Sequence, residues 1–369
     1  MWNFYQPVRV LWGEGQAKSL GSVMEEHGWK NGFMIADAFL VNNGMAARIA
    51  EETGGRVTGI SSDVEPNPTV QNVDRGAERA KSLEADCILA FGGGSAMDCA
   101  KAVAAAVAMD CVAGELLAGR KITRALPVIA IPTTAGTGSE VTAGAVLSDK
   151  EKGIKEAIFS PALFPAVALV DPELTYSVPA KVTAATGLDV LAHALDALSS
   201  VKAEEATDAL ALRAAKLAIG YLERAVRDGA DREARAAMSK ASTIAGLAFS
   251  QTGTTGSHAC SYILTSRYGV PHGEACAFTM DSWFVINAID RPRLNDYARE
   301  LGFADAQGLA DWINGIKVRL GMRTKLEELG IKEADLPVLV DASMASGNMA
   351  NNVAQIGREG VATIFKSKK

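Results

Sequence analysis

The sequence predicts an α/β domain followed by an all-helical domain. In residues 1–179, short apolar runs typical of buried strands alternate with helical stretches. Each run ends at glycine, proline or a polar side chain, as strands do where they meet a loop. Helical periodicity then continues through residues 180–369. We therefore expect a dinucleotide-binding domain over 1–179 and a metal- and substrate-binding domain over 180–369, with the active site in the cleft between them.

The alternation in the first half predicts an open, mostly parallel sheet, because a helix between two strands returns the chain to the same edge of the sheet. The first segment, FYQPVRVLWGEG, is expected to be extended. The expected strands are 33–36, 56–60, CILAF, PVIAI and AVALV, and the expected helices are 16–28, 43–53, 69–84 and 96–108. Such sheets bind nucleotides at the carboxyl ends of their strands.

The second half is expected to be helical throughout. The expected helices are 181–200, 204–227, 231–251, 274–289, 292–301, 306–321 and 322–330. No internal repeat or low-complexity linker interrupts the chain, and its 369 residues permit two or three domains with a large core.

Composition argues against several functions. The formal net charge of −6 and the absence of a Lys/Arg-rich tail disfavour nucleic acid as a partner. Five cysteines without CxxC spacing indicate buried thiols in a reducing cytosol. The start, MWNFYQPVRV, has no signal-peptide pattern, and no apolar run reaches the length of a membrane span. We expect a cytoplasmic protein that acts on a small molecule.

Three of the four histidines lie in two short stretches. Asp189 and His193 are four residues apart, so a helix places both side chains on one face. His258 opens an apolar stretch, and His272 follows a proline and precedes a glycine, so we expect His272 to end a helix or lie on a tight loop. Three imidazoles and a carboxylate suit a divalent metal with positions left for substrate. The alternative is an aspartate beside a partly buried core histidine, and Cys276 is expected to pack in the core.

Two loops after predicted strands are candidates for holding a cofactor. In the first loop, three consecutive glycines and a serine let the backbone approach a pyrophosphate at a helix N-terminus: Gly92, Gly93, Gly94 and Ser95. The same stretch contains Asp98, a further candidate. The alternative is a tight strand-to-helix turn. The second loop, PTTAGTGSE, offers hydroxyls to a nucleotide: Thr133, Thr134, Thr137 and Ser139. Asp37, just past a predicted strand, can accept from a ribose 2′-hydroxyl and repel a 2′-phosphate, so NAD is favoured over NADP, unless Asp37 is only a helix N-cap.

Together these residues resemble the iron-dependent, or group III, alcohol dehydrogenases. The resemblance is carried by GGGSAMDCAK, PTTAGTGSE, DPELTYSVP, ATGLDVLAHAL and GVPHG. It implies a Rossmann-like N-terminal domain and an all-α C-terminal domain, the architecture shared with dehydroquinate synthase. It also implies NAD(P)-linked interconversion of alcohols with aldehydes or ketones, Fe(II) as the metal with Zn or another divalent ion as alternatives, and a homodimer or larger homo-oligomer.

Carried over position by position, the resemblance matches Asp189, His193, His258 and His272 to the four metal ligands. Its pyrophosphate loop corresponds to Gly92, Gly93, Gly94 and Ser95, and its cofactor-facing loop to Thr133, Thr134 and Thr137. The acid that goes with NAD corresponds to Asp37. The loop near the adenine corresponds to Asn67 and Pro68, and a basic residue near the cofactor to Lys155.

The sequence departs from the family at two places. Many members have a histidine four residues after the position of His258, where this chain has Tyr262, so a proton relay through that histidine is in doubt and Tyr262 becomes the candidate hydrogen-bond donor. The ending SGNMANNV resembles a subgroup that includes reductases of phosphonoacetaldehyde-like aldehydes.

The favoured function is therefore reduction of a small aldehyde, or oxidation of its alcohol, at a metal that polarises the oxygen. One alternative is a reductase specific for an anionic C2–C3 aldehyde of the phosphonoacetaldehyde or sulfoacetaldehyde type. Further alternatives are a dehydroquinate synthase-like lyase and a sensor that binds NAD and metal without turnover.

Overall fold

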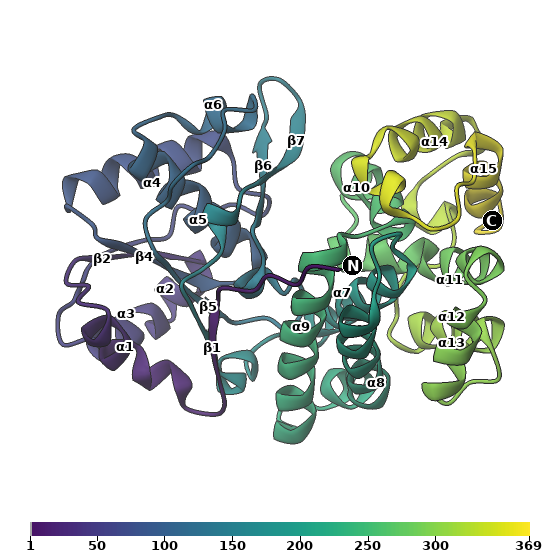
Figure 1. Cartoon of the computed structure of the whole chain (residues 1–369), viewed down its shortest axis with the longest axis horizontal. Coiled ribbons are helices and arrows are strands. Elements are labelled where there is room, and N and C mark those ends of the chain that lie inside the picture. Colours follow the sequence, from purple (N-terminus) through teal and green to yellow (C-terminus); the bar gives the residue numbers. More distant parts are fainter. Residues whose placement is uncertain (1) are drawn as a thin grey trace. The chain divides into compact units, whose positions relative to one another are not determined.

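The computed structural model describes residues 2–369, apart from the side chain of Ile154. Its internal contacts divide the chain into two compact units, which Figure 1 shows as an α/β part and a helical part. The α/β unit is Gln6–Ser177. The helical unit is Val178–Lys369 together with the short N-terminal segment that ends at Tyr5.

A six-stranded sheet forms the centre of the α/β unit, with every pair of neighbouring strands parallel, as expected. Its order is β1-β8-β5-β4-β2-β3. The strands are β1 Arg9–Trp12, β2 Gly32–Ala36, β3 Val57–Ser61, β4 Cys87–Gly92, β5 Val128–Pro132 and β8 Val167–Val170. The inner strands β2, β4, β5 and β8 are buried along their whole length, which explains their uninterrupted apolar sequences.

Helices cover both faces of this sheet (Figure 1). Alternate residues of a strand serve opposite faces: Phe33 and Ile35 pack with α4 and α5, whereas Met34 and Ala36 pack with α1 to α3. The helices are α1 Leu20–Glu26, α2 Ala38–Asn42, α3 Met45–Glu51, α4 Val70–Ser82, α5 Gly94–Met109 and α6 Ala113–Leu117.

A hairpin that the sequence analysis did not predict follows the second candidate loop. β6, Gly144–Asp149, pairs antiparallel with β7, Ile154–Phe159, and the two form a separate sheet. Buried and part-exposed residues alternate along β6, which shows that only one face of the strand is buried. Such a short half-buried strand has no long apolar run, so the apolar-run criterion missed it.

The helical unit is built around α7, Ala180–Ser199, which is buried on all sides over most of its length. This burial agrees with its Ala- and Leu-rich sequence. The other α-helices are α8 Glu205–Arg227, α9 Arg232–Thr252, α10 Gly256–Tyr268, α11 His272–Asp290, α12 Arg293–Glu300, α13 Ala306–Arg319, α14 Leu336–Ala345 and α15 Arg358–Lys366. The sequence analysis gave no bounds for α10, α14 and α15.

Two expectations about this unit are wrong. The helix expected at 322–330 is only a 3-10 turn, Glu327–Leu329, because Gly330 adopts a left-handed conformation and Glu328 accepts the backbone amides of Thr324 and Lys325. His272 does not end a helix or lie on a loop, because it is the first residue of α11. Pro271 precedes it as N-cap, a position that needs no amide hydrogen.

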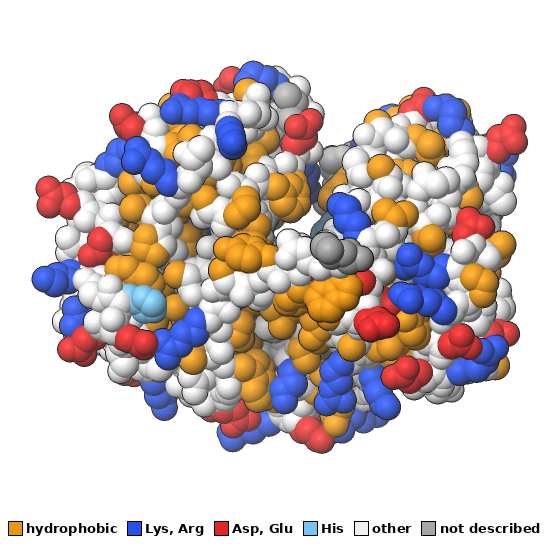
Figure 2. Space-filling model, in the orientation of Figure 1, with side chains coloured by type: hydrophobic (Ala, Val, Ile, Leu, Met, Phe, Trp, Pro, Cys, Tyr) orange, Lys and Arg blue, Asp and Glu red, His pale blue; other side chains and the backbone are white. Residues whose placement is uncertain are grey.

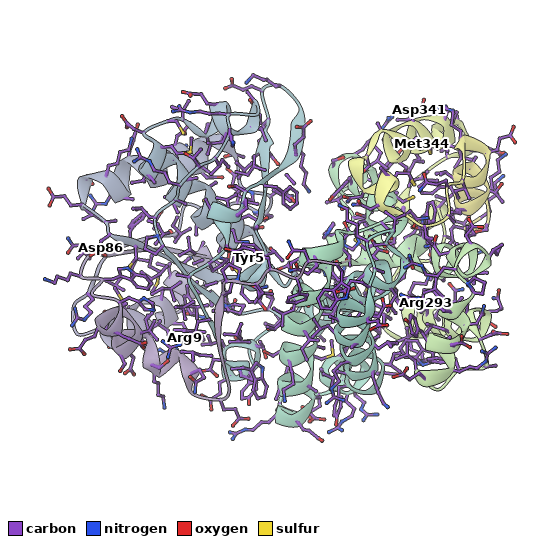
Figure 3. The ribbon with its side chains drawn as sticks, in the orientation of Figure 1. Tyr5, Arg9, Asp86, Arg293, Asp341 and Met344 are labelled. Carbon is purple, nitrogen blue, oxygen red and sulfur yellow. The ribbon has the colours of Figure 1, made fainter. Side chains whose placement is uncertain are left out.

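The N-terminal segment belongs with the helices and not with the sheet. The Tyr5 amide donates to Gln251 Oε1 at 3.0 Å, and Gln251 Nε2 donates to the Tyr5 carbonyl at 2.9 Å; Tyr5 is labelled in Figure 3. On the face shown in Figure 2, acidic and basic side chains are interspersed and do not form one basic patch. Among residues 2–369, none of the helices combines the length and apolar character needed to cross a membrane.

Candidate metal centre and cofactor loops

One face of α7 carries three polar side chains in an otherwise apolar helix. Asp189, His193 and Asp196 follow one another at spacings of four and three residues, so they lie one above the next. All three are buried, with exposed fractions of 2%, 5% and 3%. Buried polar groups need partners, so this face must contact other polar groups inside the unit.

Helices α10 and α11 bring two more histidines to this face. His258 is the third residue of α10, and His272 is the first residue of α11. Gly273 permits the approach, because a Cβ atom there would lie 2.0 Å from the Ala185 carbonyl oxygen and 2.9 Å from the Asp189 Cβ. The glycine after His272 therefore lets the start of α11 pack directly on α7.

The histidine nitrogens surround one carboxylate oxygen. Asp189 Oδ1 lies 3.9 Å from His193 Nε2, 3.7 Å from His258 Nε2 and 4.0 Å from His272 Nε2. Ligand atoms about 2.1 Å from a tetrahedral ion are about 3.4 Å apart. The separations are therefore only a few tenths of an ångström longer than metal coordination requires.

The electrostatics of the cluster also fit a cation. Asp189 Oδ1 and His258 Nε2 are buried, and neither has a hydrogen-bond partner among the residues that the structure describes. Burial raises the pKa of Asp189 to about 7, although His258 opposes the shift. Two buried acceptors that face each other are suited to binding a positive ion. Carboxylate and imidazole donors suit Fe(II), Zn and related divalent ions.

Two members of this cluster were missed or misjudged in the sequence analysis. Cys276 was expected only to fill the core, but its Sγ lies 3.7 Å from His272 Nε2. One donor atom from each of Asp189, His258, His272 and Cys276 lies within 4.8 Å of the other three. Asp196 was not considered, although it lies 2.8 Å from His258 Nδ1. Spacing could have found both, because Cys276 is one turn after His272 and Asp196 two turns after Asp189.

Tyr262, the candidate donor, borders the cluster. Its ring stacks on His272 with centroids 6.2 Å apart, and its hydroxyl accepts from Asn348 Nδ2 at 3.0 Å. The asparagine-rich ending therefore reaches a metal-site histidine through Tyr262. Trp283 and Phe284 of α11 are each only 1% exposed and pack in the core.

In the α/β unit, the three glycines form the junction of β4 and α5: Gly92 ends the strand, Gly93 is the N-cap and Gly94 begins the helix. Gly92 has φ +156°, and a Cβ atom there would lie 2.5 Å from Asp37 Oδ2. A Cβ atom at Gly94 would lie 2.7 Å from Thr137 Cγ2. The Thr133 amide donates to the Gly92 carbonyl at 3.0 Å. The two candidate loops are thus in contact at the carboxyl edge of the sheet, and side chains at the glycines would push them apart.

Asp37 joins these loops from the neighbouring strand. It stands at the N-cap position of α2 but makes no side-chain capping bond there. Its Oδ2 instead accepts from the Gly93 amide at 3.0 Å. Burial raises the pKa of Asp37, and this hydrogen bond opposes the shift. Asp37 is therefore the N-cap residue of α2 by position, as the alternative expected, but its carboxylate does not cap the helix and lies beside the glycine loop.

A second group of predicted cofactor residues gathers near the start of α5. The Asn67 amide donates to Ser95 Oγ at 3.3 Å, and Lys155 Nζ donates to Asn67 Oδ1 at 2.7 Å. Asn67 has φ +60°, a strained conformation for a residue with a side chain. Ser95 does not cap α5, whose N-cap is Gly93.

Two further predicted cofactor residues, Asp98 and Ser139, are engaged inside the protein. Ser139 Oγ donates to Asp98 Oδ1 at 3.0 Å and accepts from the buried Lys101 Nζ at 2.8 Å. Asp98 Oδ2 also accepts from the Val146 amide at 3.0 Å. These bonds tie α5 to the second loop and to β6, which gives Asp98 and Ser139 a structural role.

Fold and site together define a class: a nucleotide-binding α/β unit joined to helices that bring His258 and His272 to the buried carboxylate of Asp189. The family model described as iron-containing alcohol dehydrogenase matches residues 7–172, and the model of the C-terminal part of that family matches residues 183–369. The chain belongs to the iron-containing alcohol dehydrogenase family. Its members are metal-dependent, NAD-linked alcohol dehydrogenases and aldehyde reductases, and this chain is one of them.

Individual relatives resemble the chain over nearly its whole length. A 1-propanol dehydrogenase from Citrobacter freundii is 38% identical over 93% of this chain and 88% of its own. The structure of sulfoacetaldehyde reductase from Bifidobacterium kashiwanohense in complex with NAD+ is 42% identical, with a TM-score of 0.96, and covers 100% of this chain and 98% of that one. A structure of 1,3-propanediol oxidoreductase is 30% identical, with a TM-score of 0.94 and complete coverage of both chains.

Proposed function

We propose that this protein interconverts a small aldehyde and its alcohol with NAD, using a divalent metal held by Asp189, His193, His258 and His272. One observation carries the proposal: two buried acceptors, Asp189 Oδ1 and His258 Nε2, face each other at 3.7 Å, and neither has a hydrogen-bond partner within the described part of the chain. Burying both without a cation is costly, so their arrangement is best explained by an ion.

The ligand residues are held by the fold. The ring of His193 stacks on Phe249 with centroids 4.1 Å apart and on His258 at 4.6 Å, which restricts its rotation. Asp189 supplies the single negative charge of the set. His272 is the most exposed ligand, with 36% of its side chain accessible, so we place the substrate on its side. When bound, the metal supplies a Lewis acid for the substrate oxygen, and the nicotinamide carries the hydride.

We assign NAD to the α/β unit through the glycine loop, the threonine loop and Asp37. Gly94 and Ser95 begin α5 and are only partly buried, so the N-terminus of this helix suits a pyrophosphate. The half-buried carboxylate of Asp37 disfavours the extra phosphate of NADP. The NAD+ complex of the similar sulfoacetaldehyde reductase supports the same choice.

The native metal is proposed to be iron, after the family. Three imidazoles and a carboxylate do not by themselves discriminate Fe(II) from Zn. A homo-oligomer in the cytosol is part of the same proposal, and the five free cysteines agree with a reducing compartment.

A second candidate is a reductase of anionic C2–C3 aldehydes. It is favoured by the 42% identity to a sulfoacetaldehyde reductase and by the Asn348–Tyr262 pair beside His272. An amide and a phenol next to the proposed metal can donate hydrogen bonds to a sulfonate or phosphonate. The two candidates share the metal and cofactor and differ only in the substrate.

The test is NADH oxidation by protein loaded anaerobically with Fe(II). Propanal, butanal, glycolaldehyde, succinic semialdehyde, phosphonoacetaldehyde and sulfoacetaldehyde are compared by kcat/KM. We expect turnover of small aldehydes that disappears after chelation. Preference for neutral aldehydes supports a general reductase, and preference for the sulfonate or phosphonate supports the second candidate. Bound metal and NADH without turnover of any aldehyde would contradict both.

A further inference from the structure

We propose that Asp196 is a positioning residue that holds the proton of His258 on Nδ1 and thereby directs the Nε2 lone pair at the metal. Asp196 is hydrogen-bonded to His258 Nδ1, whereas Asp189 faces the other ring nitrogen, Nε2, so we assign Asp196 a role through His258. The inference rests on the proposed metal site and adds a residue to it that neither the sequence analysis nor the comparisons assign.

The contacts of Asp196 determine which atoms carry protons. Oδ2 accepts from the Thr255 amide at 2.7 Å and lies 2.8 Å from His258 Nδ1. Oδ1 accepts from Ser257 Oγ at 2.8 Å. An amide can only donate, so Oδ2 is an acceptor, and an acceptor beside Nδ1 requires a proton on Nδ1. The neutral ring then has its lone pair on Nε2, the atom that faces Asp189 Oδ1 at 3.7 Å.

The same contacts fix the ring in space. Asp196 lies on α7, whereas Thr255, Ser257 and His258 lie at the start of α10. One carboxylate therefore fastens the start of α10 to the helix that carries Asp189 and His193. A carboxylate on the far nitrogen of a metal-binding histidine sets its tautomer and orientation and raises its basicity. These groups are buried, so water does not replace the bond.

The experiment compares zinc-loaded wild-type protein with Asp196→Asn. Asparagine can keep its oxygen toward Thr255 and His258 and donate to Ser257, so the fold is retained and only the negative charge is lost. Zinc affinity is measured by chelator competition. We expect a loss of about 10- to 100-fold, the range found when such supporting groups are changed. Asp196→Ala removes the acceptor as well and should weaken zinc binding further.

A spectroscopic readout separates positioning from a merely structural role. The chain has only four histidines, so their ¹⁵N-imidazole signals can be assigned by single substitutions. In the zinc-loaded wild type, His258 should show a strongly deshielded, slowly exchanging Nδ1–H. In Asp196→Asn this proton should move upfield, because a neutral amide is a weaker acceptor than a carboxylate.

Asp208→Asn is the matched control. Asp208 is another buried carboxylate of the helical unit, with an exposed fraction of 3%. It accepts a hydrogen bond from Tyr297 Oη at 2.7 Å and forms an ion pair with Arg293, which is labelled in Figure 3. Its replacement should leave zinc affinity and the His258 signals unchanged. If Asp196→Asn also leaves both unchanged while His258→Ala loses zinc, the positioning role is wrong and the metal site stands. If His258→Ala keeps wild-type affinity, the metal site and this inference both fail.

Discussion

At the residue scale, the contacts of Asp37 allow charge and hydrogen bonding to be tested separately. Its Oδ2 accepts from the Gly93 amide at 3.0 Å, and an asparagine oxygen can accept the same bond. Asp37→Asn therefore keeps the loop but removes the charge, whereas Asp37→Gly removes both. If the charge repels a 2′-phosphate, either change should shift kcat/KM toward NADPH relative to NADH, by about tenfold or about 1.4 kcal/mol.

Asp86→Asn is the control for this prediction. Asp86, labelled in Figure 3, precedes β4 and likewise accepts backbone amides, from Lys30 at 2.7 Å and Asn31 at 3.1 Å. It lies at the amino end of the strand, away from the glycine loop. Its replacement should not alter the cofactor ratio. An unchanged ratio in both Asp37 variants would show that Asp37 only braces the Gly93 amide.

The sequence predicted many single residues of the site, and the reason is scarcity. Three of four histidines in two short stretches stood out, and the structure brings His258 and His272 to within 4.8 Å of Asp189 and Cys276. Asp196 and Cys276 did not stand out, because aspartates are common and cysteine is an ordinary core residue. The role of Asp196 depends on the nitrogen of His258 that it faces, and the role of Cys276 depends on how α10 and α11 pack on α7. Neither can be predicted from a local sequence pattern.

At the element scale, the turn from β4 to α5 is defined by its contact with the second loop. A Cβ atom at Gly94 would lie 2.7 Å from Thr137 Cγ2, and any relief moves the threonine loop. Gly94→Ala should therefore raise the dissociation constant for NADH, by about tenfold or more, because the approach of backbone to pyrophosphate is lost. Fluorescence titration of NADH measures this.

Gly114→Ala gives the comparison in the same unit. Gly114 lies in α6, and a Cβ atom there meets nothing within 4 Å. Alanine at that helical position should leave NADH binding unchanged. Equal NADH affinities of the two variants and the wild type would show that the glycine loop does not approach the cofactor.

Elements with a long apolar run or a strong helical period were predictable, and those without were not. The buried strands β2, β4, β5 and β8 and the long helices α7, α8 and α9 correspond to their sequence patterns. The hairpin β6–β7 was missed because it is half-buried, and the helix expected at 322–330 failed because left-handed Gly330 and the side chain of Glu328 terminate the backbone pattern.

At the scale of the whole molecule, the C-terminus is anchored inside the helical unit. Lys368, the penultimate residue, and Lys317 of α13 both pair with Asp281 of α11, the latter at 2.9 Å. The side chains of these three residues are 7%, 1% and 6% exposed. Removal of the buried carboxylate would leave two ammonium groups without a counter-charge. The ion cluster joins three parts of the chain that are distant in sequence: α11, α13 and the C-terminus.

Asp281→Asn should lower the free energy of unfolding at pH 7 by about 3–5 kcal/mol, the usual effect of breaking a buried ion pair. Burial raises the pKa of Asp281, but Lys317 and Lys368 lower it further, so the folded-state pKa lies below the ordinary value. The stabilisation is therefore complete above about pH 4 and is lost as the pH falls through the lower folded pKa. The difference between wild type and variant in urea unfolding should shrink in acid.

Asp296→Asn, which breaks an exposed pair with Arg299, should have little effect on unfolding. A difference between wild type and Asp281→Asn that stays the same down to pH 2 would contradict the pH prediction. Equal stability of wild type and Asp281→Asn at pH 7 would show that the cluster does not hold the C-terminus.

The central claim is that one divalent ion at Asp189, His193, His258 and His272 is required for NAD-linked aldehyde reduction. It is tested most directly by removing all metal, returning Fe(II) in steps without oxygen, and measuring bound iron and NADH oxidation on the same samples. We predict that activity rises in proportion to bound iron and stops at one ion per chain, and that Asp189→Asn binds no iron at these concentrations. Full activity without metal, or wild-type iron binding by Asp189→Asn, would contradict the claim.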